Sequence, residues 1–385
     1  MSNAKDNVLR PDGVEGAPHP SETMALIGHQ DAEAEFLTAH TLDRLHHGWL
    51  LTGARGVGKA TLAYRMTRYL LATVSEDGGL LGHSEPKQTL DIDPNDPVIP
   101  RIKAGSEARL KVITRSVTDT GRLSDMIRVE DVRALHSFFG LRVPDNGYRV
   151  VIIDAADEMN DQAANALLKM LEDPPPKAVL LLISHQPSRL LPTIRSRCRI
   201  LRLSSLNATE MTRALDQAGV KPSDPLSTQA LTELADGSVG AAFRLQNEEG
   251  LTLYSELINL LGSLPKLDSQ KAMTLANSVA GPRNRSRLVL LLDLFDIAFG
   301  RLARRGSLRT SPPAAAQNES AVLAQLAPDV PAARLWAESA SDVSKRMRHG
   351  IEVNLEPSTL ILDALIRISE TSKKISRQPT TPVPT

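Results

Sequence analysis

A glycine-rich stretch at residues 50–61, LLTGARGVGKAT, constrains the fold more than any other part of the chain. Apolar residues lead into glycine, four residues, glycine and lysine, a pattern typical of a phosphate-binding loop between a strand and a helix. Glycines let such a loop curve so that amide N–H groups at the start of the helix point toward phosphates. The candidate nucleotide-binding residues in this stretch are Gly53, Gly56, Gly58, Lys59 and Thr61.

The loop departs from the usual pattern at Ala60, where a serine or threonine hydroxyl normally ligates Mg²⁺. Thr61 lies one residue later, rotated by ~100° around the helix, so its hydroxyl is no obvious replacement. Three roles therefore stay open for the loop: it hydrolyses a nucleotide, it holds one without turnover, or it only supports the fold. ATP is the candidate cofactor, and Mg²⁺ is expected only where ATP is bound.

Apolar strands that alternate with helices predict an α/β fold, a parallel sheet covered by helices on both faces. Strands are expected at residues 49–52, 109–114, 148–154, 178–184 and 199–203, and helices at 34–45, 59–73, 129–139 and 161–172. After residue 204 the strands stop. Three short helices are expected within 206–246, and only helices within 251–373.

These changes in pattern divide the chain into domains. We expect a disordered tail at residues 1–22, a nucleotide-binding domain at 23–204, a three-helix domain at 205–248, a helical domain at 249–373 and a second tail at 374–385. The length of 385 residues suits two or three domains of ordinary size. Residues 75–110 are rich in glycine and proline, which predicts an insertion or a long connection.

Composition excludes several kinds of protein. With 45 basic and 45 acidic residues the formal net charge is zero, so the whole chain is no polyelectrolyte partner for nucleic acid. Cys198 is the only cysteine, which excludes an intramolecular disulfide and a multi-cysteine zinc site. Because no apolar stretch approaches the roughly 20 residues of a membrane span and the start is polar, we expect a cytoplasmic protein without a membrane partner.

Asp154 ends an apolar strand, at the place where nucleotide-binding folds of this kind carry a Mg²⁺-coordinating carboxylate. Ala155 follows, although a general base is expected there and an alanine cannot polarise water. Asp157 and Glu158 lie past the end of the strand, where capping or solvating the next helix is the favoured interpretation. A self-sufficient ATPase that uses Asp157 or Glu158 as its base stays open as an alternative.

Arg195, Arg197 and Arg199 come directly before a buried strand. A run of charge is often a solvated face, but guanidinium groups at the rim of a nucleotide fold also suit a neighbour's phosphates. Cys198 is expected to be a small buried hydrophobe. His185, after the preceding strand, is expected to be a loop residue.

A second alternative is a DNA-binding module in the C-terminal half. Arginines at 283, 285, 287, 301, 304, 305 and 309 motivate it. A solvated helical face explains the same arginines more simply, and the two interpretations differ in the salt dependence of DNA affinity.

Several stretches together resemble the bacterial clamp-loader family of AAA+ proteins. Over roughly residues 24–204 they are HHGWLL leading into GARGVGKA, then VVIIDAADEMN, ANALLKMLEDPP and SRLLPTIRSRCRI. The later LADGS at 234–238 resembles the family's lid, and NLEP at 354–357 resembles the start of its helical collar. The resemblance implies a P-loop AAA+ module followed by a small helical lid and an all-α collar through which subunits oligomerise.

Motor subunits of this family keep a complete phosphate loop, an acidic pair after the strand aspartate and a lid arginine. This chain has Ala60, Ala155 and Gly240 at those positions. The resemblance therefore implies a stator without ATP hydrolysis of its own, with Arg197 as an arginine finger acting in trans on the ATP of an adjacent motor subunit.

The resemblance also implies what the chain works with. Expected partners are motor (gamma/tau) and delta subunits, with the sliding clamp and primer-template DNA reached through the complex during ATP-dependent clamp loading in replication. The complex belongs to a DNA polymerase holoenzyme, but nothing in this chain indicates polymerase or nuclease chemistry. The family often carries a four-cysteine zinc module, and zinc is not expected here because residues 75–110 contain no cysteine.

Overall fold

A computed structural model describes residues 13–72, 89–117, 123–140, 147–220, 224–281 and 284–377. The chain forms two compact units. Unit 1 is Met1–Val220 with Gly237–Gly240, and unit 2 is Lys221–Asp236 with Ala241–Thr385. No helix formed by the described residues is long and apolar enough to cross a membrane.

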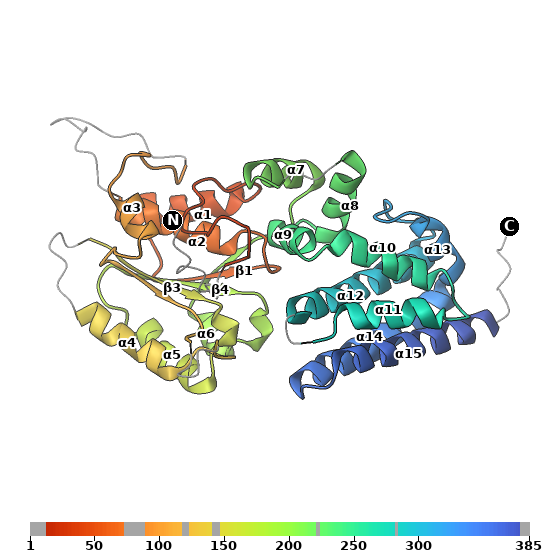
Figure 1. Cartoon of the computed structure of the whole chain (residues 1–385). Helices are drawn as coiled ribbons and strands as arrows, with labels where there is room; N and C mark the ends of the chain where they lie inside the picture. The colour runs from red at the N-terminus through yellow and green to blue at the C-terminus, as the bar shows by residue number, and fades with distance from the viewer. Residues whose placement is uncertain are drawn as a thin grey trace, which may run out of the picture. The chain divides into compact units, whose positions relative to one another are not determined.

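Unit 1 is built on a five-stranded parallel sheet with the strand order β2-β3-β4-β1-β5. The strands are β1 (Gly48–Thr52), β2 (Leu110–Ile113), β3 (Arg149–Asp154), β4 (Ala178–Ser184) and β5 (Arg199–Arg202). Figure 1 shows α1 (Gln30–Thr41), α2 (Lys59–Leu71) and α3 (Val98–Lys103) over one face, and α4 (Val129–Gly140), α5 (Asp161–Glu172) and α6 (Pro192–Ser196) over the other. The predicted α/β fold class is confirmed.

The two faces of the sheet have separate apolar cores, because successive side chains of a strand point to opposite sides. In β1, Trp49 and Leu51 pack with Phe36 of α1 and Leu62 of α2. Leu50, between them, belongs to the other core, which α4, α5 and α6 cover. The sheet is therefore buried on both faces, and only its ends and edges can present polar groups.

The N-terminal residues differ from the prediction of a tail over 1–22. Ser21 is buried, and its carbonyl oxygen accepts a hydrogen bond from the guanidinium of Arg68 (3.1 Å), which also donates to the carbonyl of Thr23 (2.6 Å). A buried arginine needs acceptors, and here backbone carbonyls of this segment supply them. Residues 1–12 lie outside the described residues.

The three short helices predicted within 206–246 are present but are shared between the units. In unit 1 lies α7 (Ala208–Gln217), whereas α8 (Pro225–Ala235) and most of α9 (Val239–Asn247) belong to unit 2. The domain boundaries predicted at residues 204 and 248 stay predictions.

In its described residues the rest of unit 2 is helical, as predicted. The remaining helices are α10 (Gly250–Leu261), α11 (Ser269–Ser278), α12 (Arg285–Leu308), α13 (Glu319–Leu326), α14 (Val330–Glu352) and α15 (Pro357–Arg377). Helix α14 packs against α12 and α15, and α11 also packs against α15. A buried ion pair joins Arg301 of α12 to Glu319 of α13 (2.6 Å), and the hydroxyl of Tyr254 donates to the same carboxylate. The predicted tail at 374–385 begins inside α15, and residues 378–385 lie outside the described residues.

Candidate functional site

The predicted phosphate loop lies between β1 and α2, at the carboxyl-terminal edge of the sheet. Gly53, Gly56 and Gly58 have φ angles of +147°, +81° and +106°, and Gly58 is the N-cap of α2. Only glycine adopts such angles without strain. A Cβ atom at Gly56 would also lie 2.5 Å from the hydroxyl oxygen of Ser238. The loop thus needs its glycines, as the sequence predicts, and its binding of a phosphate stays a prediction.

Lys59 is folded back over this loop. Its Nζ donates to the carbonyl oxygens of Gly53 (2.8 Å) and Ala54 (2.6 Å), and the residue is only 3% exposed. Burial lowers the pKa of Lys59 to about 8, although the nearby carboxylates of Asp154 and Asp157 favour the charged form. A buried cation with this pKa is poorly compensated by its surroundings, and an anion at the loop would compensate it better.

The segment Gly237–Gly240 closes against the same loop within unit 1. The hydroxyl of Ser238 donates to the carbonyl of Arg55 (2.8 Å), and the N–H of Gly240 donates to the carbonyl of Gly56 (3.1 Å). A Cβ atom at Gly240 would lie 2.9 Å from the Cα of Gly56. The position implied to have lost a lid arginine therefore has no room for a side chain in this arrangement.

Asp154 ends β3 as predicted, but the acidic residues after it have roles that the sequence did not reveal. The two carboxylate oxygens of Asp157 accept hydrogen bonds from the backbone N–H groups of His185 (2.9 Å) and Gln186 (3.1 Å). Glu158 pairs with Arg115 (2.9 Å). The favoured interpretation, that both residues cap or solvate the next helix, is wrong because Asn160 caps α5 and Asp157 instead braces the loop after β4.

Ser184 is the last residue of β4. It is fully buried, and its hydroxyl has no hydrogen-bond partner among the described residues. A buried polar atom without a partner is uncommon and requires an explanation. Ser184 pairs in register with Thr52, the last residue of β1, so it lies at the same edge of the sheet as the loop.

In the described ranges no group of three or more His, Cys, Asp or Glu side chains could hold a metal ion.

Arg197 lies at the opposite, amino-terminal edge of the sheet. It follows α6 and precedes β5, and β5 pairs with β1 in the register Arg199 to Trp49. Arg197 is therefore level with the residue before β1, whereas the phosphate loop begins after Thr52. At a rise of ~3.3 Å per residue, roughly 20 Å of strand separate the two. The arginine and the loop cannot act on one nucleotide within the same chain.

Arg197 and Arg199 have different surroundings although they are two residues apart. Arg197 is 36% exposed; its Nη2 pairs with Glu172 (2.9 Å) and its Nη1 donates to the carbonyl of Thr193 (3.2 Å). Arg199 pairs with Glu35 (2.7 Å) and lies over the ring of Trp49. Cys198, predicted to be a small buried hydrophobe, is partly buried against the apolar core, and this burial raises the thiol pKa to about 12.

The known proteins similar to this chain include subunits of a bacterial DNA polymerase. A family model described as DNA polymerase III, delta subunit, matches residues 28–207. A DNA polymerase III subunit delta' from Pseudomonas aeruginosa is 34% identical over 249 residues, which cover 65% of this chain and 69% of that protein. The chain belongs to the delta-prime subunit family of DNA polymerase III.

Other delta-prime proteins and related subunits are also similar to this chain. The delta-prime subunit of Yersinia pestis is 30% identical over 246 residues, 60% of this chain and 67% of that protein. The tau subunit of Salmonella typhimurium is 24% identical over 282 residues, 71% of this chain and 40% of that protein. A crystal structure of a DNA polymerase III gamma subunit-related protein from Thermotoga maritima aligns with a TM-score of 0.45 at 17% identity, over 88% of this chain and 99% of that one.

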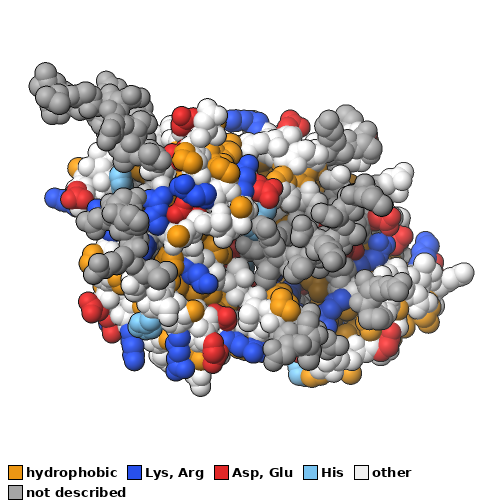
Figure 2. All heavy atoms as spheres, turned by 60° about the vertical axis from the view of Figure 1, so that its left-hand side comes forward, with side chains coloured by type: hydrophobic (Ala, Val, Ile, Leu, Met, Phe, Trp, Pro, Cys, Tyr) orange, Lys and Arg blue, Asp and Glu red, His pale blue; other side chains and the backbone are white. Residues whose placement is uncertain are grey.

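Two of the arginines that motivated a DNA-binding module in this delta-prime family member have acidic partners. Arg301 is buried against Glu319, and Arg287 pairs with Glu249 (3.3 Å). Arg283 lies outside the described residues. Figure 2 shows a face of the molecule on which basic and acidic side chains are interspersed, and it labels none of these arginines. Structural pairing accounts for Arg287 and Arg301, and the DNA-binding alternative stays a prediction for the other arginines.

Proposed function

We propose that this chain is the stator of a clamp loader. It takes part in ATP-dependent loading of a sliding clamp onto primed DNA during replication, in the cytoplasm, and it supplies Arg197 in trans to the ATP of a neighbouring motor subunit. Its partners are motor subunits of the gamma/tau kind and a delta subunit, with the clamp and primer-template DNA reached through the assembly. Similarity to delta-prime, tau and gamma proteins supports this proposal.

The observation that carries the trans role is the separation of Arg197 from the chain's own phosphate loop. The two lie at opposite edges of one sheet. An arginine that completes a nucleotide site from this position must act on another chain. Arginine suits that task because its planar guanidinium is always charged and can donate several hydrogen bonds to a phosphate.

A second argument concerns hydrolysis by the chain itself, which we propose is absent. Ala60 has no hydroxyl for Mg²⁺ and Ala155 has no carboxylate for water. Asp157, the alternative base, uses both oxygens to brace the loop after β4, and Glu158 is paired with Arg115. No described contact favours the self-sufficient ATPase.

The loop still suits a phosphate group, although it does not suit metal-dependent turnover. Gly56, Gly58 and Lys59 would hold a bound ATP, and the buried Ser184 hydroxyl offers a further donor at the same edge. Such a nucleotide would supply charge for Lys59 and a fixed loop rather than chemistry. We propose that any Mg²⁺ enters only with the nucleotide.

The test is reconstitution with motor and delta subunits. The purified chain alone should show no ATPase, and the assembled loader should show it. Arg197→Ala should leave assembly intact by size-exclusion chromatography and lower hydrolysis at the shared site by about 10³-fold or more. Arg199→Ala is the control, because Arg199 is engaged with Glu35 and Trp49. Unchanged turnover by the Arg197→Ala loader would refute the trans role.

A further inference from the structure

We propose that Glu172 is a positioning residue that holds the Arg197 side chain ready for the nucleotide of a neighbouring subunit. This inference rests on the trans role proposed above. Glu172 is the last residue of α5, and its carboxylate lies 2.9 Å from Nη2 of Arg197. The carbonyl of Thr193 accepts from Nη1, so two acceptors on different helices grip the same guanidinium.

The contacts with Glu172 and Thr193 leave Arg197 able to bind an anion. A guanidinium has five N–H donors, and these two contacts occupy only part of them. The side chain is 36% exposed and that of Glu172 is 52% exposed, so the pair is open to a surface of another chain. An arginine whose rotamers are already restricted loses less entropy when it meets a phosphate.

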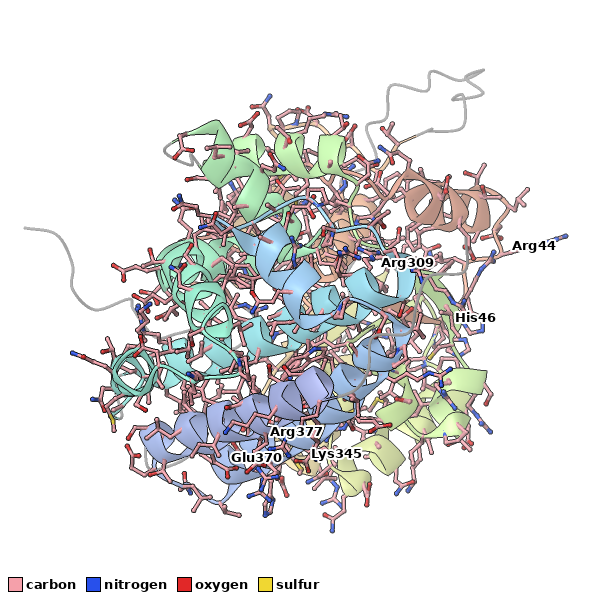
Figure 3. The ribbon with its side chains drawn as sticks, turned by 90° about the vertical axis from the view of Figure 1, so that its right-hand side faces the viewer. Arg44, His46, Arg309, Lys345, Glu370 and Arg377 are labelled. Atoms are coloured by element: carbon pink, nitrogen blue, oxygen red, sulfur yellow. The ribbon has the colours of Figure 1, made fainter. Side chains whose placement is uncertain are left out.

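The backbones on either side of this pair are fixed by the fold. A Cβ atom at Gly48 would lie 3.2 Å from the carbonyl oxygen of Arg197, so β1 and Arg197 are in close contact. The ring of His47 bonds through Nε2 to the carbonyl of Leu171 (3.0 Å), which holds the end of α5 to the start of β1. Figure 3 labels His46, which stacks on His47, and Arg44, which points away from the fold in the same connection.

The place of Glu172 in its helix argues against a role in helix stability. The carboxyl-terminal end of a helix carries partial negative charge, which disfavours an acidic side chain there. Asp173 follows as the C-cap, so two carboxylates stand at this end of α5. An exposed ion pair also contributes little to folding. What Glu172 does provide is a fixed acceptor for Arg197.

The same edge of the sheet offers a matched control. Glu35 pairs with Arg199 at 2.7 Å, and these side chains are 40% and 45% exposed. Glu35 therefore resembles Glu172 in charge, exposure and type of partner, but its arginine lies over Trp49 rather than at the position proposed for the finger. If the removal of any acidic side chain from this edge lowers ATP turnover, Glu35→Gln should lower it as much as a change at Glu172.

The experiment measures ATP turnover by loaders assembled with Glu172→Ala, Glu172→Gln or Glu35→Gln. Glu172→Ala should lower kcat by about threefold to tenfold while the KM for ATP changes by less than about twofold, because a poorly held finger affects the transition state more than binding. Glu172→Gln keeps an acceptor oxygen and should recover part of the loss. Glu35→Gln should match the wild type.

The outcomes separate this inference from the function it rests on. If Arg197→Ala has no effect, the trans role fails. If Arg197→Ala is inactive but Glu172→Ala turns over as fast as the wild type or faster, the trans role stands and the positioning role is overturned. A loss in Glu172→Ala that accompanies loss of the complex on size exclusion, without recovery in Glu172→Gln, also overturns it.

Discussion

Replacing Gly56 by alanine should destabilise unit 1 by more than the strain of its positive φ angle, because the new Cβ atom would also collide with its neighbours. A non-glycine residue at φ +81° costs about 1–2 kcal/mol. The new Cβ would also lie 2.5 Å from the Ser238 hydroxyl and 2.9 Å from the Cα of Gly240, and overpacking of this kind typically adds about 1–3 kcal/mol. The expected loss is therefore about 2–5 kcal/mol in the free energy of unfolding.

Gly219 provides the matched control. Its φ angle is +77°, and a Cβ atom there would meet nothing within 4 Å. Gly219→Ala should therefore cost only the angle, about 1–2 kcal/mol. Both changes reduce the freedom of the unfolded chain equally, so the difference between them measures the contact of the loop with Gly237–Gly240.

The chain has two tryptophans, and they lie in different units: Trp49 in unit 1 and Trp336 in unit 2. Urea unfolding followed by tryptophan fluorescence in a Trp336→Phe background therefore reports unit 1. The midpoint should fall further for Gly56→Ala than for Gly219→Ala, with an unchanged slope. Equal losses for the two variants would refute the closure of Gly237–Gly240 on the phosphate loop.

Two further predictions concern buried charges. Burial lowers the pKa of Lys59 from 10.5 to about 8, so between these pH values the unfolded chain holds a proton that the folded chain has lost. The free energy of unfolding should therefore rise with pH by roughly 1.4 kcal/mol per pH unit, relative to Lys59→Met. Urea unfolding measured across this pH range checks this, and the same pH dependence in both proteins would contradict it. Glu319→Ala should lower the free energy of unfolding by about 3–5 kcal/mol because it leaves Arg301 buried without its carboxylate. Glu233→Ala removes a more exposed acid 3.7 Å from Arg301 and should lower it by less than about 1 kcal/mol. Unfolding followed by the fluorescence of Trp336 checks this, and similar losses of stability for the two variants would contradict it.

Long elements could be predicted from the sequence because several local features agree. The helix at 161–172 and the strand at 178–184 have the predicted bounds. Asn160 caps that helix and a run of prolines follows it, so both ends are marked in the chain. The helices α3 and α6 were not predicted, since five or six residues are too few for a helical period to appear.

The contacts that define the site could not be predicted, because they join residues far apart in the chain. Ser238 bonds to a residue 183 positions earlier, and Asp157 bonds to His185, 28 positions later. The charge pattern alone does not distinguish Arg197 from Arg199, and in the sequence only the family resemblance singles out Arg197. Their difference comes from partners on α1 and α5, which only the folded sheet brings to them.

The contacts that close the phosphate loop, and the position of Arg197 at the other edge of the sheet, are consistent with the stator role proposed above. A loop that exchanges nucleotide must break and remake its contacts in every cycle, whereas here Ser238, Gly240 and Lys59 all bond to carbonyl groups of the loop. Gly240 makes this closure possible, since any larger residue would collide with Gly56. The absence of a side chain at Gly240 therefore allows the Gly237–Gly240 segment to lie against the phosphate loop. Contacts of this kind hold the Gly237–Gly240 segment on the loop, as the stator role proposed above would require.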